Sequence, residues 1–236
     1  MSSLSQDKVD PTPDYPPEEG RYIRGNDYSP VAVAVILIHN QEDIPPDIEN
    51  LVRVAVERGA ALAGTIQTEN IGIEKMICNI VANPNIRYLV ICGPESPGHQ
   101  CGEALLMLVE NGVDQHRKIV GATARTPFLF NIPSDHIERF RRQIRVIDLI
   151  NEGDADLVRR AVWSCYQESP TEFRGYSLCD PGAYPEAPLA GRITWRVTRP
   201  QAEPKDEPER QQREKLRDLM GKIRRAAETK HTRQDN

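Results

Sequence analysis

One histidine lies at the end of a loop that could present it to a ligand. His99 closes the glycine- and proline-rich run 93–99, which follows an apolar strand pattern at 88–92 and precedes helical sequence. In an open α/β sheet, ligands bind at the loops that follow the carboxyl ends of strands. Gly93 and Gly98 would let the backbone approach a large flat or phosphorylated ligand, because glycine has no Cβ. The pattern favours a cofactor-binding loop, and the alternative is a solvated histidine at a helix start.

Two further loops follow predicted strands and are expected to lie beside the first. In the loop 68–72, Thr68, Glu69 and Asn70 could hydrogen-bond the polar edges of a ligand, or they could simply cap the next helix. In the run 122–130, small residues would allow close approach to a ring system, although an ordinary surface loop can have the same composition. Together the three loops could form one broad pocket.

The elements that must position these loops follow from hydrophobic periodicity. Strands are predicted at 31–38, 61–67, 86–92, 118–122 and 145–150, and helices at 47–56, 68–83, 100–111, from 134 onward and at 154–168. The run 31–38 is continuously apolar, which is typical of a central strand that is buried on both faces. Strands alternating with helices predict an α/β fold with a doubly wound, mostly parallel sheet.

The chain divides into four parts by composition. Residues 1–30 are polar and rich in proline, which predicts an extended, weakly ordered arm, and 31–170 form the α/β domain. Residues 171–200 predict an irregular extension with one edge strand at 191–198. Residues 201–236 form a charged linker and an amphipathic helix, with an apolar stripe at Leu216, Leu219, Met220, Ile223 and Ala227. That stripe could dock on this chain or on a partner, and a membrane surface is a further alternative.

Composition excludes several classes of protein. The net charge of -5 among 236 residues gives no electrostatic case for nucleic-acid binding. The five cysteines are scattered, without a CxxC pair or zinc-finger spacing, and the longest apolar run is far shorter than the ~20 residues of a membrane span. We therefore expect a soluble cytoplasmic protein without a membrane span.

Common catalytic signatures are missing from the sequence. There is no GxGxxG after the first predicted strand, no GxxxxGK[ST], no HExxH and no GxSxG. The usual dinucleotide, nucleoside triphosphate, metalloprotease and hydrolase sites are therefore not indicated, and the three loops would have to form a less common site.

Long, idiosyncratic segments link the chain to a family. Between about residues 11 and 168 it resembles the A subunit of tetrahydromethanopterin S-methyltransferase, which is the corrinoid-carrying component of that complex. The resemblance is carried by TENIGIEK at 68–75, NPNIRYLV at 83–90, Gly98-His99, ENGV at 110–113 and the amino-terminal segments Tyr15-Pro16, Gly20-Arg21-Tyr22 and 29–33.

The resemblance implies a Rossmann-like domain that binds cobalamin, with His99 as the axial ligand to its cobalt. It also implies that the three loops contact the corrin and its amide side chains. The residues expected there are Thr68, Glu69, Asn70, Gly72, Gly93, Pro94 and Gly98, with Ala122, Pro127 and Phe128 completing the pocket. Glu95 could orient the imidazole, or it could be a solvated loop carboxylate.

The implied activity is methyl transfer through the corrinoid. Co(I) would accept a methyl group from a methylated pterin or another donor, and methyl-Co(III) above His99 would pass it to an acceptor. Imidazole is a good donor to Co(III), whereas four-coordinate Co(I) needs no axial ligand, so binding and release of His99 would follow the methylation state. A pterin-dependent methyltransferase subunit is the expected partner. A non-catalytic cobalamin-binding or sensing module, and a flavin- or nucleotide-dependent α/β enzyme, are the alternatives.

One departure from the family concerns the carboxyl-terminal part. Membrane-bound members end in a hydrophobic anchor, whereas residues 171–236 of this chain are polar and charged. We therefore expect a soluble relative, and the resemblance does not extend to membrane attachment or to coupling with sodium transport.

Overall fold

The sheet has five strands, of which four run parallel. The computed structural model describes residues 7–38 and 43–194. Across the sheet the strands follow the order β1-β3-β2-β4-β5, and β1 pairs antiparallel with β3 at one edge. Their bounds are Tyr22–Arg24 (β1), Val31–Ile36 (β2), Leu62–Ile66 (β3), Tyr88–Gly93 (β4) and Arg145–Ile150 (β5). The fold is thus α/β with a mostly parallel sheet, as the alternation of strands and helices predicts.

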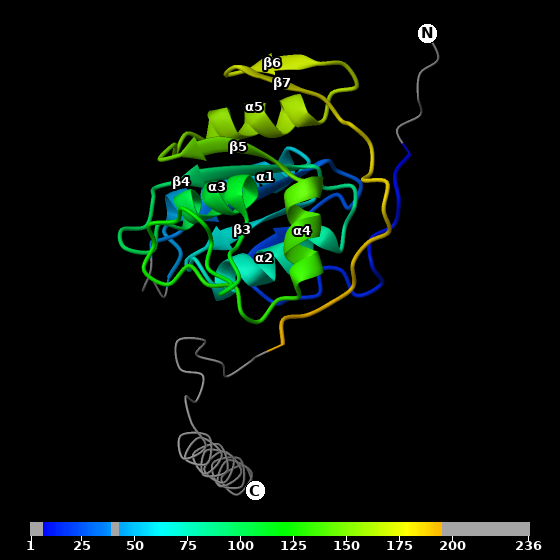
Figure 1. Ribbon diagram of the computed structural model, residues 1–236. Coiled ribbons are helices and arrows are strands. Elements are labelled where there is room, and N and C mark those ends of the chain that lie inside the picture. Colours follow the sequence, from blue (N-terminus) through cyan, green and yellow to red (C-terminus); the bar gives the residue numbers. More distant parts are fainter. Residues whose placement is uncertain (1–6, 39–42, 195–236) are drawn as a thin grey trace, which may run out of the picture. The chain divides into compact units, whose positions relative to one another are not determined.

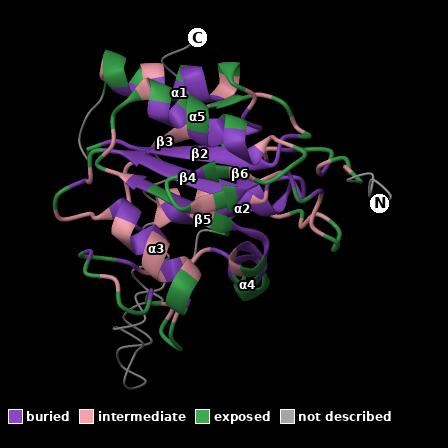
Figure 2. Cartoon of the chain, turned by 90° about the horizontal axis from the view of Figure 1, so that it is seen from above, coloured by how far each residue is buried: buried purple, intermediate pink, exposed green. Residues whose placement is uncertain are grey.

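Helices cover both faces of this sheet (Figure 1). On one face lie α1 (Pro46–Glu57) and α5 (Ala155–Cys165), and on the other lie α2 (Ile71–Val81), α3 (Cys101–Asn111) and α4 (Ser134–Gln143). Seen from above, the strands form a buried layer between the two sets of helices (Figure 2). This arrangement explains why the central strands β2 and β4 are apolar and buried along their whole length.

The central strand β2 has a different side chain type on each face. Val31, Val33 and Val35 pack in the cluster formed with α1 and α5, whereas Ala32, Ala34 and Ile36 belong to the cluster formed with α2, α3 and α4. Successive side chains of a strand point to opposite faces, so this alternation follows directly from the sequence VAVAVI. At Ala32 and Ala34 the α2 face of β2 therefore carries smaller side chains than the valines of the α1 face.

Two predicted elements differ from the structure. Residues 118–122 do not form a strand of the sheet, and only isolated bridges join Val113 to Ile119 and Lys118 to Phe128. Within 171–188, expected to be irregular, β6 (Thr171–Phe173) and β7 (Tyr176–Leu178) form an antiparallel hairpin beside α5. Short strands bounded by turn residues give too little periodicity to be recognised in a sequence. No strand occupies 191–194, and the rest of 191–198 and the predicted carboxyl-terminal helix lie outside the described residues.

The amino-terminal arm is more ordered than its composition predicts. It contributes β1 to the sheet, and Tyr15 is buried in the core beside α2. The amide of Asn85 donates to the backbone oxygens of Val9 at 2.7 Å and Asp27 at 3.0 Å, and Asn83 also donates to Asp27. The NPN part of the NPNIRYLV segment therefore holds the arm against the domain, at the end of β4 opposite the loop 93–99.

The lengths and compositions of the helices show whether one of them could cross a membrane. Among residues 7–38 and 43–194, no helix combines the length and the apolar character that crossing a membrane requires.

Candidate functional site

The sheet order brings two of the predicted loops together. Strand β2 pairs with β3 on one side and with β4 on the other, all three in parallel. The turn 68–70 follows β3 and the loop 94–99 follows β4, so both emerge at the carboxyl edge of the sheet on either side of β2. This is the edge at which parallel α/β folds bind ligands.

A histidine and a buried carboxylate meet between these two loops. Nδ1 of His99 donates to Oε2 of Glu69 at 2.6 Å, across a sequence separation of thirty residues. The Glu69 side chain is fully buried, whereas that of His99 is 23% exposed. The carboxylate lies beneath and the imidazole extends toward the surface, so the pair can act on something that approaches the edge of the sheet.

The third loop closes over Glu69 from the other side. Oε1 of Glu69 accepts hydrogen bonds from the backbone nitrogen and from the hydroxyl of Thr126, both at 2.8 Å. The side chain of Asn70 donates to the same Thr126 hydroxyl at 3.1 Å. Both oxygens of Glu69 are thus occupied, and the 122–130 loop is joined to the turn after β3.

These contacts determine the charge state of the carboxylate. Burial raises the pKa of the Glu69 carboxyl and is the largest single influence on it, but hydrogen bonds from His99, from the backbone of Glu69 itself and from Thr126 together outweigh burial. The pKa therefore lies below its ordinary value, and Glu69 is ionised at neutral pH. An ionised carboxylate can only accept, so Nδ1 of His99 carries the proton of that hydrogen bond.

Glu95 has a different role from the one considered in the sequence. Its Oε1 accepts from the backbone nitrogens of Ser96 at 2.9 Å and Gly102 at 3.2 Å, and its Oε2 accepts from Glu103 at 2.9 Å. Glu95 therefore caps the amino terminus of α3, where unpaired amides favour a negative charge. The carboxylate that orients the imidazole is Glu69, and the hypothesis that Glu95 holds that position is wrong.

The conformation of the loop requires glycine at Gly93 and Gly98. Gly93 has φ +86°, and a Cβ there would lie 3.0 Å from the carbonyl oxygen of Ile36. Gly98 has φ +81°, and a Cβ would lie 3.2 Å from Nε of Arg125. Both positions require positive φ and close packing within the chain, so the glycines shape the loop whether or not a ligand touches them.

The remaining predicted residues lie in the same three loops as Glu69, His99 and Thr126. Thr68 accepts from the backbone nitrogen of Gly72 at 2.9 Å and so caps the first turn of α2. Pro127 is buried, and Phe128 is half-buried and stacks on Phe130 with ring centroids 5.1 Å apart. Two more predicted residues, Ala122 (half-buried) and Pro94 (exposed), belong to the same loops.

Thr126 is the functional candidate that sequence reasoning missed. It lies in the predicted loop, but nothing in the sequence separates it from the neighbouring small and polar residues. Its importance comes from a contact with Glu69 across 57 residues, which only the tertiary structure reveals.

Fold and site together define a class of protein. It is an α/β protein that places a histidine and an ionised carboxylate at the carboxyl edge of a mostly parallel sheet. Residues 8–180 match the family model that describes the A subunit of tetrahydromethanopterin S-methyltransferase (MtrA), and the chain belongs to this family.

Three individual relatives show how close the likeness is. The A-1 subunit of tetrahydromethanopterin S-methyltransferase from Methanothermobacter marburgensis is 44% identical over 168 residues, which is 71% of this chain and 66% of the relative. The A-2 subunit from Methanobrevibacter ruminantium is 42% identical, covering 73% of this chain and 84% of the relative. The corresponding A subunit from Methanocaldococcus jannaschii is 38% identical, covering 69% and 64%. The chain thus spans just under two thirds of the length of the first and third of these relatives.

Proposed function

We propose that this protein is the corrinoid carrier of a methyltransferase system, with His99 as the axial ligand to cobalt. The observation that carries the proposal is the hydrogen bond between Nδ1 of His99 and the buried carboxylate of Glu69. Membership of the MtrA family supports the methyltransferase part. A bound corrinoid would supply the metal that accepts and releases the methyl group.

The donor set suits a metal that a macrocycle already holds. Among the residues that the structure describes, no group of three or more His, Cys, Asp or Glu side chains could hold a metal ion by itself. One histidine at the surface provides a single donor, which is what a metal with four equatorial nitrogens from a corrin requires. Because the proton is on Nδ1, a neutral His99 would use the lone pair of Nε2 for this bond.

The chain's own residues would position and tune that donor. Glu69 fixes the ring orientation and the tautomer of His99, and its negative charge increases the donor strength of the imidazole. Thr126 and Asn70 hold Glu69 and thereby link all three loops of the site. A change at the metal would therefore be felt in the 122–130 loop, which is exposed at Thr126 and available to a partner.

The proposal also covers the type of fold, the partner protein and the cellular location. We interpret the fold as a doubly wound Rossmann-like domain, since the chain runs from β2 to β3 on one side and then crosses to β4 and β5 on the other. The cobalamin contacts would come from the residues of the three loops that follow β3, β4 and α3. A pterin-dependent methyltransferase partner would load or unload the methyl group, and the cytoplasm would be the site of action.

The axial ligand can be tested by electron paramagnetic resonance. Protein reconstituted with cob(II)alamin, with and without ¹⁵N-histidine labelling, should show a nitrogen hyperfine pattern that changes with the label. His99→Ala should abolish this change, whereas His116→Ala, at an exposed position beside Gln115, should retain it. Identical spectra for the wild type and His99→Ala would overturn the assignment. Glu69→Gln should weaken cobalamin binding about tenfold, as loss of a partner to a metal-bound histidine generally does.

Turnover separates a carrier from a sensing module. Protein loaded with reduced cobalamin is mixed with a pterin-dependent methyltransferase and its methylated pterin, and the visible spectrum is followed. A carrier becomes methylated, whereas a cobalamin sensor does not. Copurification of a yellow flavin in place of a red corrinoid would favour the alternative of a flavin-dependent enzyme.

A further inference from the structure

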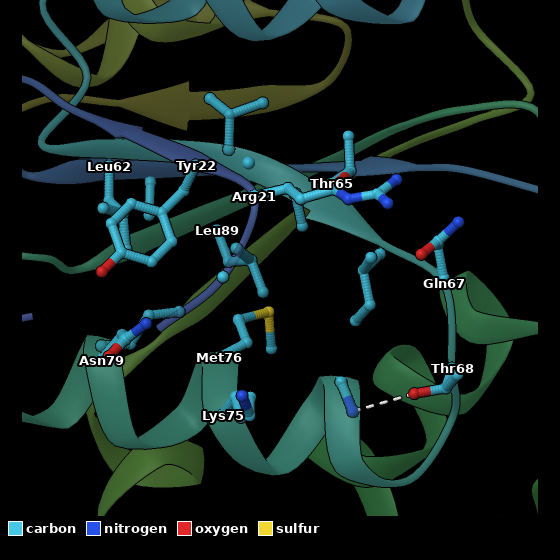
Figure 3. Close-up of a pocket in the computed structure, with 18 of the residues that line it drawn as sticks. Arg21, Tyr22, Leu62, Thr65, Gln67, Thr68, Lys75, Met76, Asn79 and Leu89 are labelled. Atoms are coloured by element: carbon cyan, nitrogen blue, oxygen red, sulfur yellow. Dashed lines mark hydrogen bonds between the residues drawn. The ribbon is translucent and has the colours of Figure 1, made fainter. Parts of the chain in front are cut away.

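A groove of about 650 Å³ lies between α1 and α5, on the face of the sheet opposite to α2. The two helices lie side by side there, and exposed residues cover their outer surface (Figure 2). The groove is separate from the pocket over Ala34, between α2 and the sheet, which shares Thr68 with the candidate site (Figure 3). None of the residues that line the groove belongs to the three loops around His99.

The lining of the groove consists of two stripes with helical spacing. They are formed by Val54, Glu57 and Arg58 on α1 and by Asp156, Arg159, Arg160 and Trp163 on α5. Residues three, four or seven positions apart lie on one side of a helix. The opposite sides of both helices pack on the sheet, through residues such as Val52 and Val158. Packing of the core therefore does not account for the side chains in the groove.

An exposed tryptophan is the main apolar group of the groove. Trp163 is 46% exposed and has the largest side chain among the exposed hydrophobic residues of the described chain. The guanidinium of Arg58 lies 4.0 Å from its ring centroid, so the contact joins α1 to α5. Tryptophan and arginine are the residue types that most often contribute large binding energies in protein interfaces. Their mutual stacking orders both side chains in advance, which reduces the entropy lost on binding.

The two acids of the groove already have partners. Glu57 accepts a hydrogen bond from Arg53 at 2.6 Å, and Asp156 accepts one from Arg159. Both carboxylates are therefore neutralised by arginines of their own helices.

Two other arginines of the groove have no carboxylate partner. Among residues 7–38 and 43–194, the guanidinium groups of Arg58 and Arg160 form no ion pair or hydrogen bond, and Arg58 interacts with the Trp163 ring. Guanidinium groups bind carboxylates through paired hydrogen bonds. The groove thus combines uncompensated positive charge with an exposed aromatic ring.

We propose that this groove docks an acidic segment of a partner protein. Carboxylates of that segment pair with Arg58 and Arg160, and an apolar side chain between them covers Trp163. The segment leaves the His99 site open, because the groove shares no residue with the three loops. The inference does not depend on the proposed function.

Two other occupants fit the observations less well. The net charge of -5 disfavours nucleic acid. The chain's own acid-rich run 203–209 would have to come from the other face of the sheet, since the described chain ends at Thr194, whose backbone nitrogen donates to Asn131 beside α2.

Trp163 can report on the groove in the full-length protein. Trp195 is the other tryptophan of the chain, so Trp195→Phe leaves a single indole resonance in ¹H–¹⁵N NMR spectra. The probe is a seven-residue peptide of six glutamates around a central leucine. It should shift the indole resonance saturably at low salt, with a dissociation constant of about 1 mM. The same peptide with lysines in place of the glutamates should cause no shift.

Charge-neutral variants test the two arginines. Arg160→Gln should weaken binding of the glutamate peptide about threefold, and Arg58→Gln combined with Arg160→Gln about tenfold. Arg142→Gln is the matched control, because it removes an exposed guanidinium from α4 and should leave the affinity unchanged. Thermal unfolding verifies that each variant is folded. Absence of a shift with the glutamate peptide, or equal affinities in all these variants, would overturn the inference.

The other occupants would give different results in the same experiment. If the chain's own acidic run fills the groove, replacing Glu203, Asp206, Glu207 and Glu209 by glutamine would move the indole resonance without any peptide. A second copy of the chain would make the resonance depend on protein concentration. A nucleic-acid site would respond to a single-stranded oligonucleotide at lower concentration than to the peptide. Each of these three results would contradict an acidic protein partner.

Discussion

The central residue of this protein is a buried carboxylate. Glu69 has no solvent exposure, yet its pKa is lowered, because hydrogen bonds from His99, from its own backbone and from Thr126 compensate the loss of water. A buried charge is tolerated only when it is paired in this way. The site is therefore sensitive to each of the groups that contact Glu69.

Acid should remove the contribution of Glu69 to stability. Because its folded-state pKa lies below the ordinary value, the unfolded chain takes up the proton first, and stability falls as the pH drops through the folded pKa. At neutral pH, Glu69→Gln should lower the free energy of unfolding by about 1–3 kcal/mol. Urea unfolding between pH 7 and pH 3 should show this difference shrinking below the ordinary carboxyl range. A difference that stays constant with pH would contradict the argument, and Glu57→Gln, at an exposed carboxylate, is the control.

The hydroxyl group of Thr126 should contribute more to stability than its methyl group. Thr126→Val keeps the shape but removes the donor to Oε1 of Glu69, and it should lower the free energy of unfolding by about 1–3 kcal/mol. Thr126→Ser retains the hydroxyl and should lie within about 0.5 kcal/mol of the wild type. Equal losses in both variants, measured by thermal or urea unfolding, would show that packing of the methyl group matters instead.

At the scale of elements, the family segment NPNIRYLV holds neighbouring segments of the chain in place. Asn83 and Asn85 hold the amino-terminal arm, and the guanidinium of Arg87 donates to the backbone oxygens of Gln143 and Gly182. The hydroxyl of Tyr88 donates to the backbone oxygen of Cys179. This segment therefore joins the arm, α4 and the 179–182 region to β4, remote from the candidate site.

Asn85 provides a direct test of this role. Asn85→Ala removes two donated hydrogen bonds and leaves the backbone oxygens of Val9 and Asp27 with fewer donors. The free energy of unfolding should fall by about 2–3 kcal/mol, and the bond after Lys8 should become accessible to trypsin. The control is Asn50→Ala on α1, whose side chain accepts a hydrogen bond from Arg53 at the surface. Unchanged proteolysis in Asn85→Ala would show that other contacts suffice to hold the arm.

Arg139 joins α4 to the segment that follows the hairpin. Its guanidinium is 1% exposed, donates to the backbone oxygens of Glu186 and Ala187, and lies 4.2 Å from the ring centroid of Tyr184. Arg139→Met should lower the free energy of unfolding by about 2–4 kcal/mol, because the backbone carbonyls of Glu186 and Ala187 lose a charged donor that holds their segment on α4. Arg142→Met removes an exposed arginine on the same helix and should change it by less than about 1 kcal/mol. Similar losses in the two variants, measured by urea unfolding, would contradict this assignment.

At the scale of the whole molecule, the segments on either side of 31–170 complete the core. Tyr15 is buried beside α2, and Phe173 and Leu178 of the hairpin are buried beside α5. The ion pair between Lys8 and Asp180, at 2.5 Å, joins the two segments to each other. Composition alone places the domain at 31–170, and these contacts extend its folded core on both sides.

Truncation should therefore unfold the domain. A fragment of residues 31–170 loses three large buried side chains, worth about 1.5–3 kcal/mol each, and the pairing of β1 with β3. That loss is comparable to the whole stability of a typical domain. A fragment of residues 7–194 should show a cooperative thermal transition, whereas 31–170 should show none. A cooperative transition in the shorter fragment would contradict this view of the core.

Much of the fold could be predicted from periodicity, and less of the site. The strands around Val33 and Val90 are predictable because central parallel strands have continuous apolar runs. The strand β1 and the hairpin were not found, since three-residue strands carry almost no pattern. At the site, the position of His99 after a strand was informative, but its pairing with Glu69 was not.

The sequence by itself determined the α/β class, the parallel core and the two loops that follow β3 and β4, because these depend on local patterns of apolar and turn residues. Only the tertiary structure decided which carboxylate meets His99, that Glu95 caps α3, and that a pocket opens over Ala34. The physical reason is that contacts across thirty or fifty-seven residues depend on strand order and on the volume left between layers. A short segment of sequence determines neither of these.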